Sequence, residues 1–425
     1  MENWQNKVSQ ALRKSESFFR TDMIYLAKSG SWLSIGHVIA MVAGFLTSLA
    51  FANLFPKESF GNYKFILSVV GILGAFSLTG MSTAITQAVS RGFGGALRQG
   101  FRINLKWGTG MLLGGLALSI YYYINDNSLL SFSFLLAGII SPITLSAGFY
   151  GAYLLGKKDF RRSSFYGMVN NIAPALALIL TLFLTQNILI IIVVYFISGA
   201  IVSLLLYRKT TQSYKQGNQE RDPELTSYGG HLSAMEVIGQ ITRHLDKILI
   251  FHYLGAAPLA IYAFAIAPVE QLQGGKKILS TLITPKVSGR PFEELQRSTP
   301  RKALLLTAYA LLLALVYTLS APYLYKLFFP QYLDSVFYSQ IYSLTLLAVA
   351  GTIFNETLIA HKKTKELYVH RTIIPIVQII LFFILLPIFG LMGLIITHVI
   401  MRSFASLLSY YFVMRPFKNI GIGSD

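Results

Sequence analysis

Apolar stretches alternate with short polar segments along almost the whole chain, from Trp32 to Val413. Each stretch holds about 20 residues, which is the length that a helix needs to cross a hydrocarbon core of about 30 Å. Membrane-spanning helices are therefore predicted over twelve segments: 32–54, 63–81, 104–124, 130–155, 164–185, 187–207, 229–254, 257–284, 303–323, 336–359, 370–388 and 391–413. The expected fold class is an all-α polytopic membrane protein.

Composition supports a membrane protein. The chain has 425 residues, of which 54% are hydrophobic and only 13% charged, whereas ordinary globular domains carry about 25% charged residues. It has no cysteine, which excludes disulfides and thiol chemistry. Residues 1–30 are polar and lack the apolar core and cleavage site of a signal peptide, so we expect them to form a cytoplasmic segment.

The distribution of positive charge predicts the orientation of the chain. With the N-terminus placed inside, 30 of the 36 Lys and Arg residues fall in the tails, at the inner ends of spans or in the inner loops. This bias is the positive-inside rule, and it predicts a protein of the inner (cytoplasmic) membrane with both termini cytoplasmic. It also accounts for the net charge of +18 without nucleic acid as a partner. The basic loops are expected to contact anionic membrane lipids.

Two segments of the chain resemble each other closely enough to indicate an internal repeat. FPKESFGNYKF (55–65) is matched by LGAAPLAIYAF (254–264), and STAITQAVS (82–90) by STLITPKVS (280–288), at offsets of 199 and 198 residues. Two halves of six spans each have the same orientation, so they are parallel repeats. The predicted organisation is a segment 1–30, a first bundle 31–207, a cytoplasmic linker 208–227, a second bundle 228–414 and a cytoplasmic tail 415–425.

The run LDKILIFHYLGAAPLAIYAFA (245–265), together with the repeat and the number of spans, resembles the polysaccharide or O-antigen flippases (Wzx-type). These belong to the multidrug/oligosaccharidyl-lipid/polysaccharide (MOP) exporter superfamily. The resemblance implies a MATE-like fold with two six-helix bundles around a central lumen. It implies translocation of an undecaprenyl-diphosphate-linked oligosaccharide by alternating access, for surface polysaccharide biosynthesis. A polysaccharide polymerase and other assembly proteins are the implied protein partners, and H⁺ or Na⁺ is the implied driving ion.

The seventh expected span, 229–254, carries an unusual amount of charge. Glu236, Arg243 and Lys247 share one helical face with Gln240, and Asp246 lies beside them. Each Arg, Lys or Asp at the centre of a span costs roughly 2.5 to 3.5 kcal/mol, so the chain is expected to use some of them.

Two interpretations of this charged face stay open. In the first, Arg243 and Lys247 line a water-filled lumen and attract the diphosphate or an acidic sugar. In the second, Arg243 and Asp246 form a structural ion pair, and Lys247 extends toward the membrane surface. Glu236 and Asp246 are candidates for ion coupling, because a buried carboxylate binds a proton readily.

Further candidates lie in other spans. Lys276 and Arg402 join the candidates for binding an anionic headgroup, although both also fit a position at the inner membrane surface. Glu270 and Glu356 join the candidates for ion coupling. Glu356 lies near the inner end of its span, where we expect it to be solvated.

Enzymatic function is not expected. The chain has no phosphate-binding Gly-rich loop, no His/Asp/Glu cluster with metal-ligand spacing and no Ser-His-Asp arrangement, so no cofactor or metal is predicted. The segments between spans are too short to form a sugar-nucleotide site. The alternative is a cation-coupled exporter of drugs or small molecules from the same superfamily, but the first span has no acidic residue of the kind such exporters often use. A structural scaffold would need no charged face.

Overall fold

The computed structural model describes residues 23–214, 219–274, 283, 287, 289–361 and 363–415, with side chains from Ile35 on except that of residue 37. All regular secondary structure in these residues is helical. The chain divides into two compact units, one comprising residues up to Ala260 with Phe328–Gln331, the other Ile261–Leu327 with the residues from Tyr332 on. Each unit is described separately.

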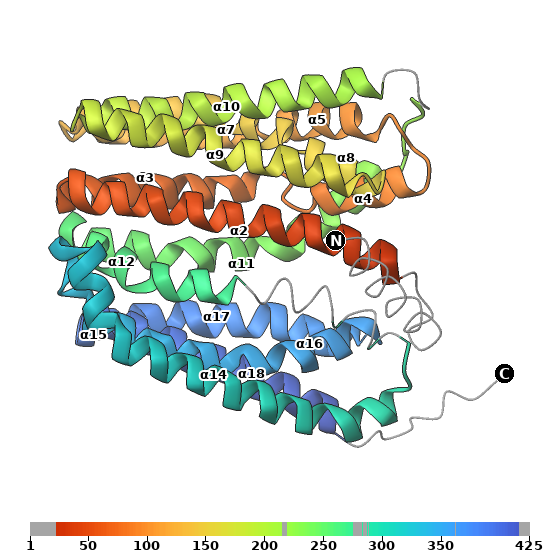
Figure 1. Ribbon diagram of the computed structural model, residues 1–425. Coiled ribbons are helices and arrows are strands. Elements are labelled where there is room, and N and C mark those ends of the chain that lie inside the picture. The colour runs from red at the N-terminus through yellow and green to blue at the C-terminus, as the bar shows by residue number, and fades with distance from the viewer. Residues whose placement is uncertain are drawn as a thin grey trace, which may run out of the picture. The chain divides into compact units, whose positions relative to one another are not determined.

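The first unit is built from α-helices and one 3₁₀ helix (η1). They are α2 (Met23–Leu54), α3 (Lys57–Leu73), η1 (Gly74–Phe76), α4 (Met81–Ser90), α5 (Ala96–Trp107), α6 (Thr109–Ile124), α7 (Ser128–Ala147), α8 (Tyr150–Gly156), α9 (Phe160–Leu184), α10 (Ile188–Ser213) and α11 (Leu225–Leu254). Helix α2 packs along α9, and α10 packs against both α7 and α9 (Figure 1).

The second unit contains most of α12 (Ala256–Gln273) and the helices that follow it. They are α14 (Phe292–Phe328), η2 (Pro330–Tyr332), α15 (Ser335–Tyr342), η3 (Ser343–Ala350), α16 (Gly351–Ala360), α17 (Thr364–Phe389) and α18 (Leu391–Met414). Helix α18 packs against α15, α16, α17 and η3. It therefore contacts every helix from α15 to α17.

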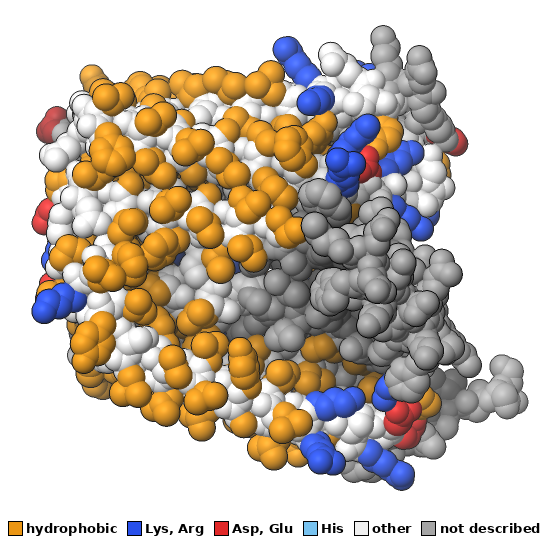
Figure 2. Space-filling view, in the orientation of Figure 1, with side chains coloured by type: hydrophobic (Ala, Val, Ile, Leu, Met, Phe, Trp, Pro, Cys, Tyr) orange, Lys and Arg blue, Asp and Glu red, His pale blue; other side chains and the backbone are white. Residues whose placement is uncertain are grey.

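Eight helical segments of the described residues are long and apolar enough to cross a membrane, and they coincide with eight of the twelve expected spans. The all-α polytopic prediction is confirmed, while the total of twelve stays a prediction. Expected spans 32–54, 104–124 and 229–254 fall on α2, α5–α6 and α11, and expected span 257–284 begins on α12 and continues into residues outside the described part of the chain. On the first unit, Figure 2 shows hydrophobic side chains along α9 and α10, and Lys and Arg side chains gathered at the end where α8 and the C-terminal end of α10 lie.

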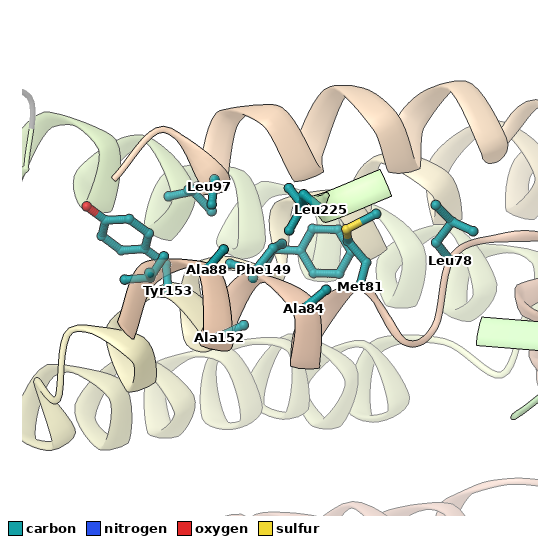
Figure 3. Packing of buried hydrophobic residues seen from close by; sticks show 12 residues of the cluster. Leu78, Met81, Ala84, Ala88, Leu97, Phe149, Ala152, Tyr153 and Leu225 are labelled. Atoms are coloured by element: carbon teal, nitrogen blue, oxygen red, sulfur yellow. The ribbon is translucent and has the colours of Figure 1, made fainter. Parts of the chain in front are cut away.

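Helix α11 packs against the helices of the first sequence repeat. Leu225, in its first turn, lies in a cluster with Met81, Leu97 and Phe149 from α4, α5 and the turn before α8 (Figure 3). Further along, α11 comes so close to the turn before α4 that a Cβ on Gly80 would lie 2.4 Å from the Cβ of Leu232. The spatial boundary between the units therefore lies within α12, whereas the repeat places the boundary between bundles at the linker.

The opposite end of α11 packs against α3. The rings of Phe65 and Phe251 stack with their centroids 3.8 Å apart, and the side-chain amide of Gln240 donates to the Gly71 carbonyl at 3.1 Å. The helix ends at Gly255, whose φ of +94° is a conformation that residues with a Cβ rarely adopt. Helix α11 is thus held by first-half partners at both ends.

The linker is anchored on both sides of its undescribed residues 215–218. Before them, the Tyr214 hydroxyl donates to Asp159 Oδ2 at 2.9 Å; burial, and then this hydrogen bond, raise the pKa of Tyr214 to about 12, so the phenol stays protonated. After them, buried Asp222 accepts a hydrogen bond from Arg91. The side chain of Gln99 pairs with both the carbonyl and the N–H of Asp222, at 2.8 and 3.1 Å. The segment that precedes α11 is therefore held in place by hydrogen bonds between Asp222 and the side chains of Arg91 and Gln99.

Candidate functional site

Helix α11 places its charged side chains in different environments. Glu236 and Arg243 are exposed, whereas the side chain of Asp246 is only 2% exposed and that of Lys247 is 20% exposed. Arg243 and Asp246 are three residues apart, which is about 60° around a helix of 3.6 residues per turn, and neighbouring helices cover Asp246 but leave Arg243 exposed. The charged residues therefore follow one another along α11 as the sequence predicts, but some of them are exposed and others are buried.

Asp246 pairs with Lys247. The Lys247 ammonium donates to the two carboxylate oxygens at 3.0 and 3.2 Å and to the Arg243 carbonyl at 3.2 Å. The Lys247 backbone N–H also donates to Asp246 Oδ1, at 2.8 Å. The guanidinium of Arg243 instead donates to Gln240, one turn earlier on the exposed face. The ion pair of Arg243 with Asp246, one of the two open interpretations, is not formed among the described residues: Asp246 pairs with Lys247, and Arg243 donates to Gln240.

Lys64 on α3 is a candidate that sequence reasoning missed. It is close enough to Lys247 for their like charges to repel, and its ammonium lies 5.1 Å from the centre of the Phe60 ring and 5.9 Å from that of Tyr63. No carboxylate of the described residues lies within ion-pair distance of Lys64. The available signal was its place among the few basic residues outside the inner segments.

Lys64 and Lys247 lie at matching depths. Each is about 10 Å along its helix from the end at which α3 begins and α11 finishes, at 1.5 Å per residue. These two ends approach closely, since a Cβ on Gly61 would overlap the Ala256 carbonyl, which is consistent with the repulsion between the two lysines. Asp246 forms an ion pair with Lys247 but not with Lys64, so the two ammonium groups and this carboxylate together carry a net positive charge.

The second unit holds a separate polar cluster around Arg402 of α18. Its guanidinium donates to Gln273 Oε1 and Glu270 Oε1 of α12, each at 2.6 Å, and lies 5.4 Å from the centre of the Tyr342 ring. The Tyr342 hydroxyl also donates to Glu270 Oε1. The amide of Gln273 donates to Thr345 of η3 at 2.7 Å. Arg402 and Glu270, expected in different roles, are thus ion-pair partners.

The remaining candidates have other surroundings. Glu356 is buried, with 7% of its surface exposed, so the expectation of a solvated carboxylate was wrong: distance from the end of a span does not fix which side of the helix is covered. Lys276 lies outside the described residues. Within the described part of the chain, no group of three or more His, Asp or Glu side chains could hold a metal ion.

Comparisons with known proteins identify the fold and the family. Among solved structures the chain resembles an outward-facing MATE multidrug transporter of the MOP superfamily (TM-score 0.64, 15% identity, 91% of this chain and 94% of the other). It also resembles the lipid II flippase MurJ in an inward closed conformation (0.65, 15%, 90% and 87%). A third similar structure is a MOP superfamily transporter from Pyrococcus furiosus (0.58, 14%, 91% and 95%). At such identities the likeness shows the fold, so the MATE-like prediction is confirmed.

No curated protein matches the sequence. A family described as "Polysaccharide biosynthesis protein" matches residues 26–284, more than half of the chain and all of α11. The chain belongs to this polysaccharide biosynthesis protein family, as the resemblance to Wzx-type flippases of the MOP superfamily predicts.

Proposed function

We propose that the protein is a flippase that moves an undecaprenyl-diphosphate-linked oligosaccharide across the cytoplasmic membrane by alternating access, for surface polysaccharide biosynthesis. The observation that carries this proposal is the pair of lysines, Lys64 of α3 and Lys247 of α11, which are close enough to repel while Asp246 forms an ion pair with Lys247. The transporter fold and the family support a role in transport for polysaccharide biosynthesis, and the excess positive charge supports an anionic substrate.

The charge balance favours an anionic substrate group. Arg243, Lys247 and Lys64 are cations, and Asp246 is the carboxylate among them; Glu236 lies about 16 Å from Lys247 along the helix. Ionisable groups within membrane spans face protein or water rather than lipid, so the exposed members border a water-filled path. A diphosphate would bind these donors through charge-assisted hydrogen bonds.

Residues at different depths in the membrane are proposed to have different roles. Lys64 and Lys247 receive the diphosphate near the outer ends of their helices. Arg243, one turn deeper, offers a planar fork that suits two phosphate oxygens. Glu236 and Glu356 are the carboxylates proposed for ion coupling. Both termini are placed in the cytoplasm, and a polymerase is the proposed protein partner.

Surface polysaccharide in a strain that lacks the gene tests the proposal. Complementation with Lys64→Ala, Arg243→Ala or Lys247→Ala is expected to give little surface polysaccharide at normal membrane levels of the protein. Lys326→Ala is the matched control, because Lys326 is an exposed lysine near the end of α14. Full complementation by the three variants would contradict the proposal.

The alternative function is cation-coupled export of drugs or small molecules, which the likeness to a multidrug transporter favours. The absence of any acidic residue from Trp32 to Leu54 argues against it. Loss of the gene would then change drug susceptibility and leave the surface polysaccharide intact.

A further inference from the structure

We infer that Glu270 is a resident anion that holds the phosphate-binding position on Arg402 until the diphosphate of the substrate replaces it. The inference rests on the proposed function, because it assumes an anionic substrate. It assigns Glu270 a role in selecting the substrate rather than in coupling to an ion.

The ion pair between Glu270 and Arg402 uses only one of the two carboxylate oxygens of Glu270. Both Arg402 and Tyr342 donate to the same oxygen, Oε1, and Oε2 has no hydrogen-bond partner among the described residues. The strongest carboxylate–guanidinium pairs are bidentate, with two parallel N–H···O bonds. Because Glu270 contacts Arg402 through a single oxygen that it shares with Tyr342, a group with more acceptor oxygens, such as a phosphate, can replace it.

The pair is accessible. The side chain of Glu270 is 42% exposed and that of Arg402 is 28% exposed, although both helices are apolar and belong to a chain that spans the membrane. An exposed ion pair at such a place is stable only where it borders water. An anion in a water-filled path can therefore reach Arg402, but it meets the negative charge of Glu270 first.

Arg402 stays in position when Glu270 leaves. Its second amino group donates to Gln273, whose amide is fixed by Thr345, and its planar group lies near the ring of Tyr342. Thr345 in turn donates to the Tyr342 carbonyl at 2.7 Å. These contacts do not involve Glu270, so exchange of the carboxylate for a phosphate leaves the donor group assembled, and the Tyr342 hydroxyl donates to the phosphate in place of Glu270.

The arrangement makes the site selective. At rest the ion pair has no net charge, which lowers the cost of keeping Arg402 within a span. A monoanion with few acceptor oxygens gains little by replacing a carboxylate, whereas a diphosphate offers more charge and more acceptors. Glu270 thus sets the minimum affinity for Arg402 that a ligand needs in order to replace it.

Binding of inorganic pyrophosphate to the purified full-length protein, measured by calorimetry, tests the inference. Glu270→Gln keeps the size and the acceptor oxygen but removes the repelling charge, so it is expected to bind pyrophosphate about tenfold more tightly than the wild type. Glu270→Ala is expected to do the same, which guards against a fold defect in either variant. Adding Arg402→Gln to Glu270→Gln is expected to abolish the gain.

Glu294→Gln is the matched control, because Glu294 pairs with Arg290 at 2.9 Å in the same unit but outside this cluster. It is expected to leave pyrophosphate affinity unchanged. Unchanged or weaker binding in both Glu270 variants would show that Glu270 only positions Arg402, and absence of binding in every variant would also overturn the inference. Neither result bears on the proposed function, which is judged by surface polysaccharide in the Lys64 and Arg243 variants.

Discussion

No carboxylate of the described residues pairs with Lys64. Replacing Lys64 therefore removes a positive charge without breaking an ion pair. Removing its charge also removes repulsion with Lys247. We therefore expect Lys64→Gln to leave the melting temperature of the purified protein unchanged or higher while it lowers polysaccharide export at least about tenfold, the effect of a lost charge-assisted contact worth about 1.5 to 3 kcal/mol. Lys64→Arg should restore most of the export. A drop in melting temperature that parallels the loss of export would show a structural role instead.

Lys247 should behave differently, because its partner Asp246 is buried. Lys247→Gln leaves that carboxylate without its cation and is expected to destabilise the protein by about 3 kcal/mol, the lower end of the range for broken buried pairs. The double variant Asp246→Asn, Lys247→Gln should recover most of that stability, measured by thermal unfolding in detergent. Additive effects of the two single substitutions would exclude a coupled pair. Recovered stability without recovered export would assign Lys247 to the substrate.

The sequence predicts the register of these side chains along α11 but not their partners. Helical periodicity placed Arg243 and Lys247 on one face of α11, and the helix confirms that register. It could not choose the partner of Asp246, which depends on which side of α11 is covered by neighbouring helices. Lys64 was missed for the same reason: its importance comes from α3 lying against α11, a contact between residues distant in the sequence.

Elements were predictable where they depend on local hydrophobicity. Eight of the expected spans coincide with apolar helices, because a span is defined by its own composition. The spatial position of α11 was not predictable in this way. The repeat assigns it to the second half, while its contacts with α3 and α4 place it in the first compact unit. A repeat records equivalent order along the chain, and packing depends on which surfaces complement each other.

The end of the linker that precedes α11 is held by Asp222, which accepts a hydrogen bond from Arg91. Asp222→Ala removes the acceptor of Arg91 and should release the segment that precedes α11. We expect trypsin added to inside-out membrane vesicles to cleave after the exposed Arg221 several-fold faster in this variant, because cleavage requires local opening of the segment. Glu224→Ala is the control, since Glu224 is 76% exposed and lies 3.8 Å from Arg91. Equal cleavage of both variants would show that Asp222 does not hold the linker.

The proposed direction of transport depends on the orientation of the protein in the membrane. It rests on the bias of Lys and Arg toward one side of the predicted spans, and it is open to a direct test because the chain has no cysteine. A single introduced cysteine is therefore the sole thiol of the protein. Exposed residues at both ends of the helices are available for this purpose in each part of the described chain.

Asn125→Cys and Gln331→Cys should react with a membrane-impermeant maleimide in intact cells, because both positions follow spans that run outward in the predicted topology. Ser213→Cys and Lys365→Cys should react only after the membrane is opened. The reverse pattern would place the basic segments outside. The two lysines would then lie at the cytoplasmic end of the path, where they would capture the diphosphate on entry instead of receiving it before release. The labelling pattern thus decides at which step of transport Lys64 and Lys247 act.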